Sequence, residues 1–262
     1  MSKKKVVAII PARMAASRFP GKPLAKILDL PMIEHVRRRV SLSKVIDQTY
    51  VATCDKEIFD VVNNSGGKAV MTKDTHQRCT DRVDEAAMDL DADIVVIVQG
   101  DEPLFDPQVL EVLVKPMFEC DSMICTNLLS VIEDKADLDD IDIVKAVINN
   151  KNDVMYFSRS PIPYFRVDDK CPMYRQTGIS AFTKEFLHKF SRLDPTPKEV
   201  VESVDFLRIL EHGYSIRGVI YSQRTVGVDR EDDVASVEDI LRNDLTQKDF
   251  YEKIAQLKGE IA

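Results

Sequence analysis

The chain has 262 residues, of which 44% are hydrophobic and 31% charged, so it can form one large domain or a domain with a small appendage. Its formal net charge of −8 argues against a nucleic-acid surface. No stretch approaches the length of a membrane span, and the apolar run before Pro11 is too short for a secretory signal, so we expect a soluble, cytoplasmic protein without membrane insertion.

Residues 6–10 form an unbroken apolar run rich in β-branched side chains, which predicts a buried strand. The loop after it combines the cations Arg13, Arg18 and Lys22 with small residues that include Ala12 and Ser17. Because open α/β sheets bind ligands beyond the carboxyl ends of their strands, this loop predicts a site for a polyanion of triphosphate size. The alternative is a solvated turn. Neither the P-loop spacing nor the GxGxxG dinucleotide motif is present.

The next segments alternate between helical and strand patterns. Residues 31–40 carry apolar side chains at helical spacing, with the arginines at 37–39 expected on a solvated face. Strand patterns at 50–53 and 68–71 flank a helical pattern at 56–64. This βαβαβ order is typical of a parallel sheet with helices on both faces.

Residues 94–98, IVVIV, are the most apolar stretch and predict the central strand. Asp101 follows at its carboxyl end, where a carboxylate facing the cationic loop can hold a Mg²⁺ that bridges phosphate oxygens. We therefore predict Asp101 as a metal ligand. The alternative is an aspartate that only caps the turn before Pro103.

The remaining pattern predicts strands, helices and irregular segments in the second half of the chain. Strands are expected at 122–131, 143–148, 154–158 and 216–220, helices at 107–118, 200–212 and from 235 onward, a charged loop at 135–141 and an irregular lobe at 160–172. The five cysteines are odd in number and scattered without a CxxC motif, which predicts neither disulfides nor a zinc site.

Seven motifs in the chain together resemble those of sugar-acid cytidylyltransferases, most closely the CMP-KDO synthetases, where KDO is 3-deoxy-manno-octulosonate. In order they are IIPARMAASRFPGKPL in the first loop, GGKAVMT at 66–72, TDRVDEA at 80–86, VQGDEPL at 98–104, YFSRSPIPY at 156–164, ESVDFLRILEHG at 202–213 and VGVDREDD at 226–233. The resemblance implies an α/β, Rossmann-like nucleotidyltransferase fold with a mostly parallel twisted sheet. It also implies a single domain over residues 1–262, with a small sugar-binding and dimerisation lobe inserted at about 155–200.

The resemblance further implies a Mg²⁺-dependent, homodimeric enzyme of lipopolysaccharide biosynthesis. It would activate KDO with CTP by direct attack of the anomeric hydroxyl on the α-phosphate, releasing pyrophosphate. The residues expected in catalysis are Arg13, Lys22, Asp101 and Asp229, the last as the second metal ligand. Those expected around the nucleotide are Ala12, Arg13, Ser17, Arg18, Lys22, Thr80, Arg82 and Gln99. Arg82 could equally be a surface cation in the first turn of a helix.

Four further residues are expected to bind the sugar. Arg159 is predicted to face the sugar carboxylate, because a guanidinium matches a carboxylate bidentately; the alternative is a surface arginine. The family places an acidic, hydroxyl-contacting residue in the helix expected at 200–212, where Glu202 and Asp205 are the candidates. Glu202 could instead only stabilise a helix N-terminus.

The fourth sugar-binding candidate is Gln176, where the chain departs from the commonest family pattern. Many members carry a His, followed by Ile or Leu and Gly-Ile-Tyr, and this chain has Gln176-Thr177-Gly178-Ile179-Ser180. Since Gln donates and accepts without titrating, the hydroxyl that it reads can differ. The alternative substrate is therefore another acid, such as a modified KDO, a nonulosonate or a phosphonate. A non-catalytic nucleotide-binding regulator is a remote alternative.

Overall fold

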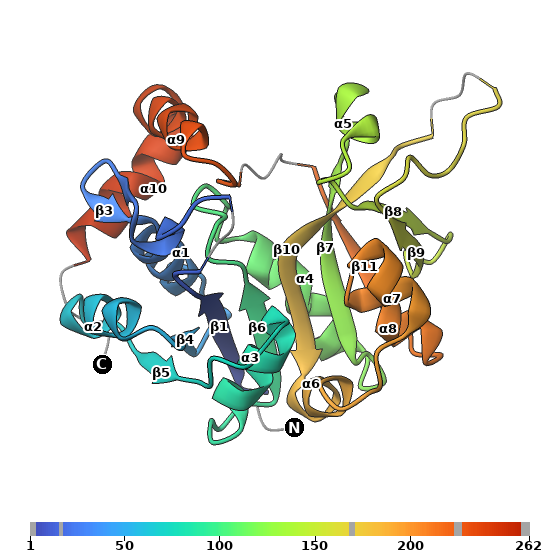
Figure 1. The fold of residues 1–262 in the computed structure, drawn as a ribbon, viewed down its shortest axis with the longest axis horizontal. Helices are drawn as coiled ribbons and strands as arrows, with labels where there is room; N and C mark the ends of the chain where they lie inside the picture. Colours follow the sequence, from blue (N-terminus) through green and yellow to red (C-terminus); the bar gives the residue numbers. More distant parts are fainter. Residues whose placement is uncertain (1–3, 16–17, 168–170, 223–226, 258–262) are drawn as a thin grey trace. The chain divides into compact units, whose positions relative to one another are not determined.

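The computed structural model describes residues 4–15, 18–167, 171–222 and 227–257. These residues form two compact units, one comprising 4–111 with 227–257 and the other 112–222 (Figure 1). Helix α4 (Val109–Glu119) carries the chain from the first unit into the second. No helix within the described ranges combines the length and the apolar character that a bilayer span requires.

Four parallel strands form the sheet of the first unit, in the order β6–β1–β4–β5. Their bounds are Ile94–Val98 for β6, Val6–Ala12 for β1, Gln48–Thr53 for β4 and Ala69–Met71 for β5. Every residue of β1 and β6 is buried. Continuous apolar runs suit strands that are covered on both faces, which confirms the prediction of two buried strands at these positions.

Helices α1 (Met32–Ser41), α2 (Lys56–Asn64) and α3 (Cys79–Ala87) connect these strands. Along the chain, the strands are added outward from β1 through β4 to β5, and β6 is then added on the other side of β1. Because such crossovers are right-handed, α3 lies on the opposite face of the sheet from α1 and α2. The carboxyl ends of β1 and β6 therefore lie side by side where the strand order reverses. Open α/β sheets bind their ligands at this position.

Two C-terminal helices complete the first unit and pack against the loop after β1. They are α9 (Asp232–Asn243) and α10 (Leu245–Gln256), and the loop contains the short elements η1 (Lys22–Leu24), β2 (Lys26–Ile27) and β3 (Leu30–Pro31). A buried cluster joins these parts through Ile27, Met32, Leu104, Val228, Val237 and Leu241. The cluster brings the segment before α9 next to the loop after β1, although the two are far apart in sequence.

The three consecutive arginines of α1 are buried, so the prediction of a solvated face is wrong. Arg37 and Arg38 both donate to the carboxylate of Glu34, at 2.7 Å. Arg38 also donates to the Ile254 carbonyl in α10, and Arg39 donates to a carbonyl in the loop after β6. The helical pattern alone could not reveal this burial, because the contacting segments lie outside the helix. They are the turn after α2 for Arg37, α10 for Arg38 and the loop after β6 for Arg39.

The same helix buries His35, whose Nε2 lies 2.8 Å from the Ile27 carbonyl and whose ring stacks on Tyr251. Burial lowers the pKa of His35 to about 4, with the positive charges of Arg39 and Arg38 acting in the same direction and Glu238 opposing them. The imidazole is therefore neutral in the folded protein near pH 7, and its Nε2–H donates to the carbonyl.

This pKa shift predicts a loss of stability in acid. Between pH 6.5 and about 4 the unfolded chain binds a proton at His35 that the native chain does not bind, so the free energy of unfolding falls as the pH falls. The contribution reaches about 3 kcal/mol at the acid end of this range. Urea unfolding at several pH values should show a shallower decline for His35→Gln than for the wild type; parallel profiles would contradict the assignment.

The second unit contains five strands in the order β11–β7–β10–β8–β9. β11 is parallel to β7, and the other neighbours are antiparallel. The strands are β7 (Cys125–Val131), β8 (Lys145–Ile148), β9 (Val154–Ser158), β10 (Tyr174–Thr183) and β11 (Arg217–Tyr221), and the helices are α5 (Ala136–Asp139), α6 (Lys184–Phe190), α7 (Pro197–Glu202) and α8 (Phe206–Glu211).

Two helical predictions in this unit need correction. The charged loop expected at 135–141 contains the short helix α5. The single helix expected at 200–212 is the end of α7 followed by α8, because Ser203 between them has the left-handed φ of 52° and ends α7. Arg208 of α8 donates to the buried carboxylate of Glu199 in α7 at 2.5 and 2.7 Å, which holds the two short helices together.

Candidate active site

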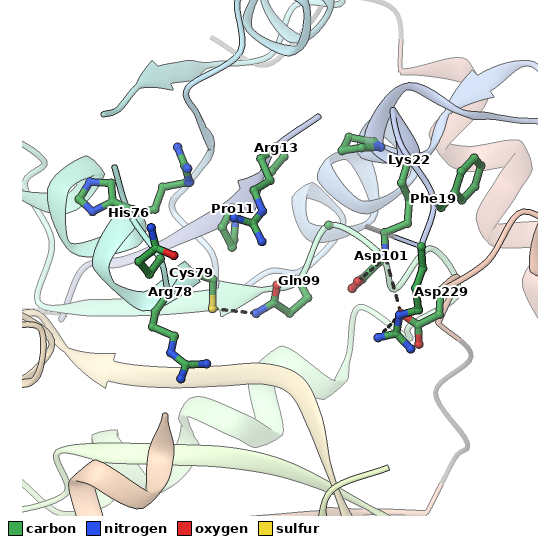
Figure 2. A pocket seen from close by; sticks show the side chains of 16 residues that line it. Pro11, Arg13, Phe19, Lys22, His76, Arg78, Cys79, Gln99, Asp101 and Asp229 are labelled. Atoms are coloured by element: carbon green, nitrogen blue, oxygen red, sulfur yellow. Dashed lines mark hydrogen bonds and ion pairs between the residues drawn. The ribbon is translucent and has the colours of Figure 1, made fainter. Parts of the chain in front are cut away.

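A cavity of about 350 Å³ lies in the first unit at the carboxyl ends of β1 and β6 (Figure 2). Its walls come from the loop after β1, the start of α3 with the segment before it, the loop after β6 and the segment before α9. Of the predicted site residues, those that line it are Ala12, Arg13, Arg18, Lys22, Arg82, Gln99, Asp101 and Asp229. Thr80 is buried in α3 outside this lining, and Ser17 lies outside the described residues.

Lys22 is the centre of a charged group at one end of the cavity (Figure 2). Its Nζ lies 2.8 Å from Oδ2 of Asp101 and 3.8 Å from Oδ1 of Asp229. The same ammonium donates to the Val228 carbonyl at 2.8 Å, and the Arg18 guanidinium lies 3.8 Å from the Asp229 carboxylate. Two carboxylates and two cations therefore converge from three separate segments of the chain.

Backbone interactions hold these segments in place. Gly21 has a φ of 75°, which favours glycine, and it forms the turn that starts η1 and directs Lys22 inward. The Val228 amide donates to the Asp101 carbonyl at 2.9 Å, which joins the segment before α9 to the loop after β6. The Asp233 carboxylate accepts hydrogen bonds from the Asp229 and Arg230 amides, so it fixes the backbone that carries Asp229.

The other end of the cavity is formed by residues around the start of α3, with Gln99 and Arg13 between the two ends (Figure 2). Gln99 donates to the thiol of Cys79 at 3.0 Å, and His76 pairs with Glu85. Arg82 is 4% exposed and donates to the Thr72 hydroxyl at 2.5 Å, so the alternative of a surface cation is wrong.

Sequence reasoning assigned no role to several residues of this lining, among them Phe19, His76, Gln77, Arg78 and Cys79. Those at 76–78 belong to the polar segment after β5, a strand parallel to β1 and β6, and Cys79 is the first residue of α3. The rule that ligands bind beyond the carboxyl ends of such strands could have selected this segment as well. No feature of the sequence indicated that Phe19 lines the cavity.

The residues expected to bind the sugar all belong to the second unit, where Arg159 and Glu202 are in direct contact. The Arg159 amide donates to the Glu202 carboxylate at 2.9 Å, and its Nε donates to the Glu202 carbonyl at 2.7 Å. Glu202 also accepts from the Ser158 hydroxyl at 2.7 Å. Glu202 is the last residue of α7, so the alternative that it stabilises a helix N-terminus is wrong.

Lys145 is a further support of Arg159 that the sequence did not indicate. Its side chain is fully buried, and Nζ donates to three carbonyls, including that of Arg159 at 2.7 Å. Arg159 Nη1 donates to the Ile141 carbonyl, while Nη2 has no partner among the described residues. Gln176 is half-buried on β10, and Asp205 directly precedes α8.

The model of the cytidylyltransferase family matches residues 7–224. The chain belongs to this family. A 3-deoxy-manno-octulosonate cytidylyltransferase of Geobacter metallireducens is 39% identical, covering 89% of this chain and 96% of the relative. An 8-amino-3,8-dideoxy-manno-octulosonate cytidylyltransferase of Shewanella pealeana is 42% identical, covering 87% and 95%. A CMP:2-keto-3-deoxy-manno-octonic acid synthetase solved with CTP is 36% identical with a TM-score of 0.87, covering 92% of this chain and all of that one.

These likenesses confirm the predicted nucleotidyltransferase fold and the family assignment. The carboxylates of Asp101 and Asp229 in this cytidylyltransferase already face one cation, the Lys22 ammonium. That donor set fits Mg²⁺, which is commonly held by one or two carboxylates together with substrate phosphates. Among the residues that the structure describes, no three His, Cys, Asp or Glu side chains gather to hold a metal ion. An ion at Asp101 and Asp229 would take its remaining ligands from water or from substrate phosphates.

Proposed function

We propose that this cytidylyltransferase transfers CMP from CTP to KDO and releases pyrophosphate. The observation that carries the proposal is the convergence of Lys22, Asp101 and Asp229 at the carboxyl ends of β1 and β6. A cationic loop and a pair of carboxylates at this position suit a nucleoside triphosphate with its metal. The likeness to the synthetase solved with CTP and to the Geobacter metallireducens relative supports CTP and KDO as substrates.

In the proposed reaction, the anomeric hydroxyl of KDO attacks the α-phosphorus of CTP in line. A phosphorus–oxygen bond to the sugar forms as the bond to the β-phosphate oxygen breaks, and the hydroxyl proton passes to solvent. No covalent enzyme intermediate is needed. Arg13, Arg18 and Lys22 neutralise the triphosphate, and Lys22 stabilises the charge that develops on pyrophosphate. Mg²⁺ held by Asp101 and Asp229 would neutralise phosphate charge and orient the reactants. Ala12, Arg82 and Gln99 would surround the base, and Ser17 and Thr80 would complete the nucleotide site.

The proposed sugar site consists of Arg159, Gln176, Glu202 and Asp205, and Arg159 provides its test. Arg159→Ala should raise the KM for the sugar acid about 10- to 100-fold, because a charge-assisted hydrogen bond to the carboxylate is lost. The KM for CTP should change little. Arg159→Lys should recover only part of the affinity, since an ammonium cannot bind a carboxylate in a bidentate manner. An increase confined to the KM for CTP would show that Arg159 belongs to the nucleotide site and not to the sugar site.

A second candidate substrate is 8-amino-KDO, favoured by Gln176 and Ser180 and by the 42% identity to the Shewanella pealeana relative. The deciding experiment measures pyrophosphate release with CTP and Mg²⁺ and, in turn, KDO, 8-amino-KDO, N-acetylneuraminate and a simple phosphonate. We expect the highest kcat/KM with KDO. A preference for another acid would overturn the assignment of KDO as the substrate but keep cytidylyl transfer as the reaction. CTP binding without turnover of any acid would indicate a regulator.

We further propose that the enzyme is a cytoplasmic homodimer. Several apolar side chains of the second unit are exposed, including Met155 at 61% and Val201 at 85%, and such surface is suited to burial against a second copy. CTP as a substrate supports the cytoplasm, where nucleoside triphosphates are available. Light scattering of the purified protein tests the dimer, and a monomer at micromolar concentration would contradict it.

A further inference from the structure

Strand β10 contains a bulge directly after Gln176. Gln176 pairs with Leu129 of β7, but the next paired residue, Ser180, lies opposite Asn127. The three residues 177–179 of β10 therefore lie opposite the single residue Leu128 of β7. A bulge interrupts the alternation of side chains along a strand and changes where the flanking side chains point. The bulge and the residues that flank it span the segment where the chain departs from the family pattern, at Gln176, Thr177 and Ser180.

The side chain of Asn127 holds this bulge in place. Asn127 is fully buried, and its Nδ2 donates to the Ile179 carbonyl at 3.1 Å and to the Thr177 carbonyl at 3.4 Å. Thr177 adds two bonds, because its hydroxyl donates to the Leu128 carbonyl at 2.9 Å and accepts from the Ile179 amide at 3.3 Å. The amide of Asn127 thus takes the place of backbone donors that the bulge removes from the strand ladder.

Only the donor half of the Asn127 amide is used, since its Oδ1 has no hydrogen-bond partner among the described residues. Burying an unpaired polar atom is unfavourable, so a leucine of similar size would be the simpler occupant if this position served packing alone. The hydrogen bonds from Asn127 to the bulge explain why an amide side chain occupies this position.

We propose that Asn127 is a positioning residue for the choice of sugar acid. It holds the bulge at 177–179, which sets the position of the half-buried Gln176, and Gln176 selects among acids that differ in their hydroxyl or amino groups. Asn127 itself is too buried to touch a substrate. The inference rests on the proposed function, because it assigns a role within that sugar site.

The test compares Asn127→Asp and Asn127→Leu with the wild type. Aspartate keeps the size of the side chain but replaces the donor by an acceptor facing two carbonyls, and leucine removes the bonds without adding charge. We expect the kcat/KM ratio between KDO and 8-amino-KDO to change at least about 10-fold, since small misplacements in a site are costly. The KM for CTP should stay within about 2-fold.

Thr126→Val is the matched control for lost stability. Thr126 is the neighbouring residue of β7, is also fully buried, and donates one hydrogen bond to the Leu113 carbonyl at 3.0 Å, away from the bulge. It should lower the melting temperature while leaving the ratio between the two acids unchanged. If Thr126→Val changed the kcat/KM ratio between the two acids equally, the Asn127 effect would be explained by general destabilisation. That result would overturn the proposal.

A double-mutant cycle tests whether Asn127 acts through Gln176. In a Gln176→Ala background, Asn127→Leu should no longer alter the ratio between the acids, because the side chain that it positions is absent. An unchanged ratio in both Asn127 variants, or an equal effect with and without Gln176, would overturn the proposal while turnover by the wild type still supports the proposed function. A wild type that turns over no acid would overturn both.

Discussion

Asp101→Asn is expected to lower turnover about 1000-fold while the protein remains folded. The substitution removes the charge that lies 2.8 Å from the Lys22 ammonium and removes an anionic oxygen ligand for Mg²⁺. Losing one preorganised electrostatic contact typically lowers the rate about 100- to 1000-fold. We expect the upper end of this range because a metal ligand is lost as well. Pyrophosphate release measured across a Mg²⁺ titration should show that the variant has lost most of its response to the ion.

Asp106→Asn is the matched control for this experiment. Asp106 lies in the same loop after β6, outside the lining of the cavity, and its Oδ1 accepts from the Gln108 amide at 2.8 Å. Asparagine keeps that acceptor but removes a charge that favours the buried Arg39 cation, so activity should stay close to that of the wild type while the melting temperature falls. Turnover by Asp101→Asn at the level of this control would remove Asp101 from the proposed metal site.

Glu34→Gln should produce the largest loss of stability, about 3–5 kcal/mol in the free energy of unfolding. Glu34 is fully buried between the guanidinium groups of Arg37 and Arg38, and both salt bridges measure 2.7 Å. Glutamine keeps the volume but removes the negative charge, which leaves two buried cations without compensation. Urea unfolding followed by circular dichroism provides the measurement.

Glu57→Gln provides the comparison, because Glu57 is an exposed residue in the first turn of α2. A surface substitution of this kind should change the free energy of unfolding by no more than about 0.5 kcal/mol. Equal effects for the two glutamates would show that the arginines of α1 are solvated in solution, as their sequence pattern first indicated.

The apolar runs of β1 and β6 were readable from the sequence because a strand buried on both faces needs a continuous run of such residues. Once both were recognised as parallel strands, the rule for their carboxyl ends selected the cationic loop and Asp101 without further information. Family motifs then supplied Asp229, Arg82 and the sugar-binding candidates, whose roles no periodicity indicated.

The tertiary structure decided the features that depend on partners distant in sequence. Lys22 donates to the Val228 carbonyl. The arginines at 37–39 donate in turn to the turn after α2, to α10 and to the loop after β6. The bulge in β10 depends on Asn127, a residue of another strand. The local pattern of polar and apolar residues indicates whether a segment is a helix or a strand and which of its faces are polar. It does not indicate which other segment packs against those faces. The sequence by itself therefore determined the family and the buried strands β1 and β6, but not β10, whereas long-range packing decided which charges are buried and which side chains meet.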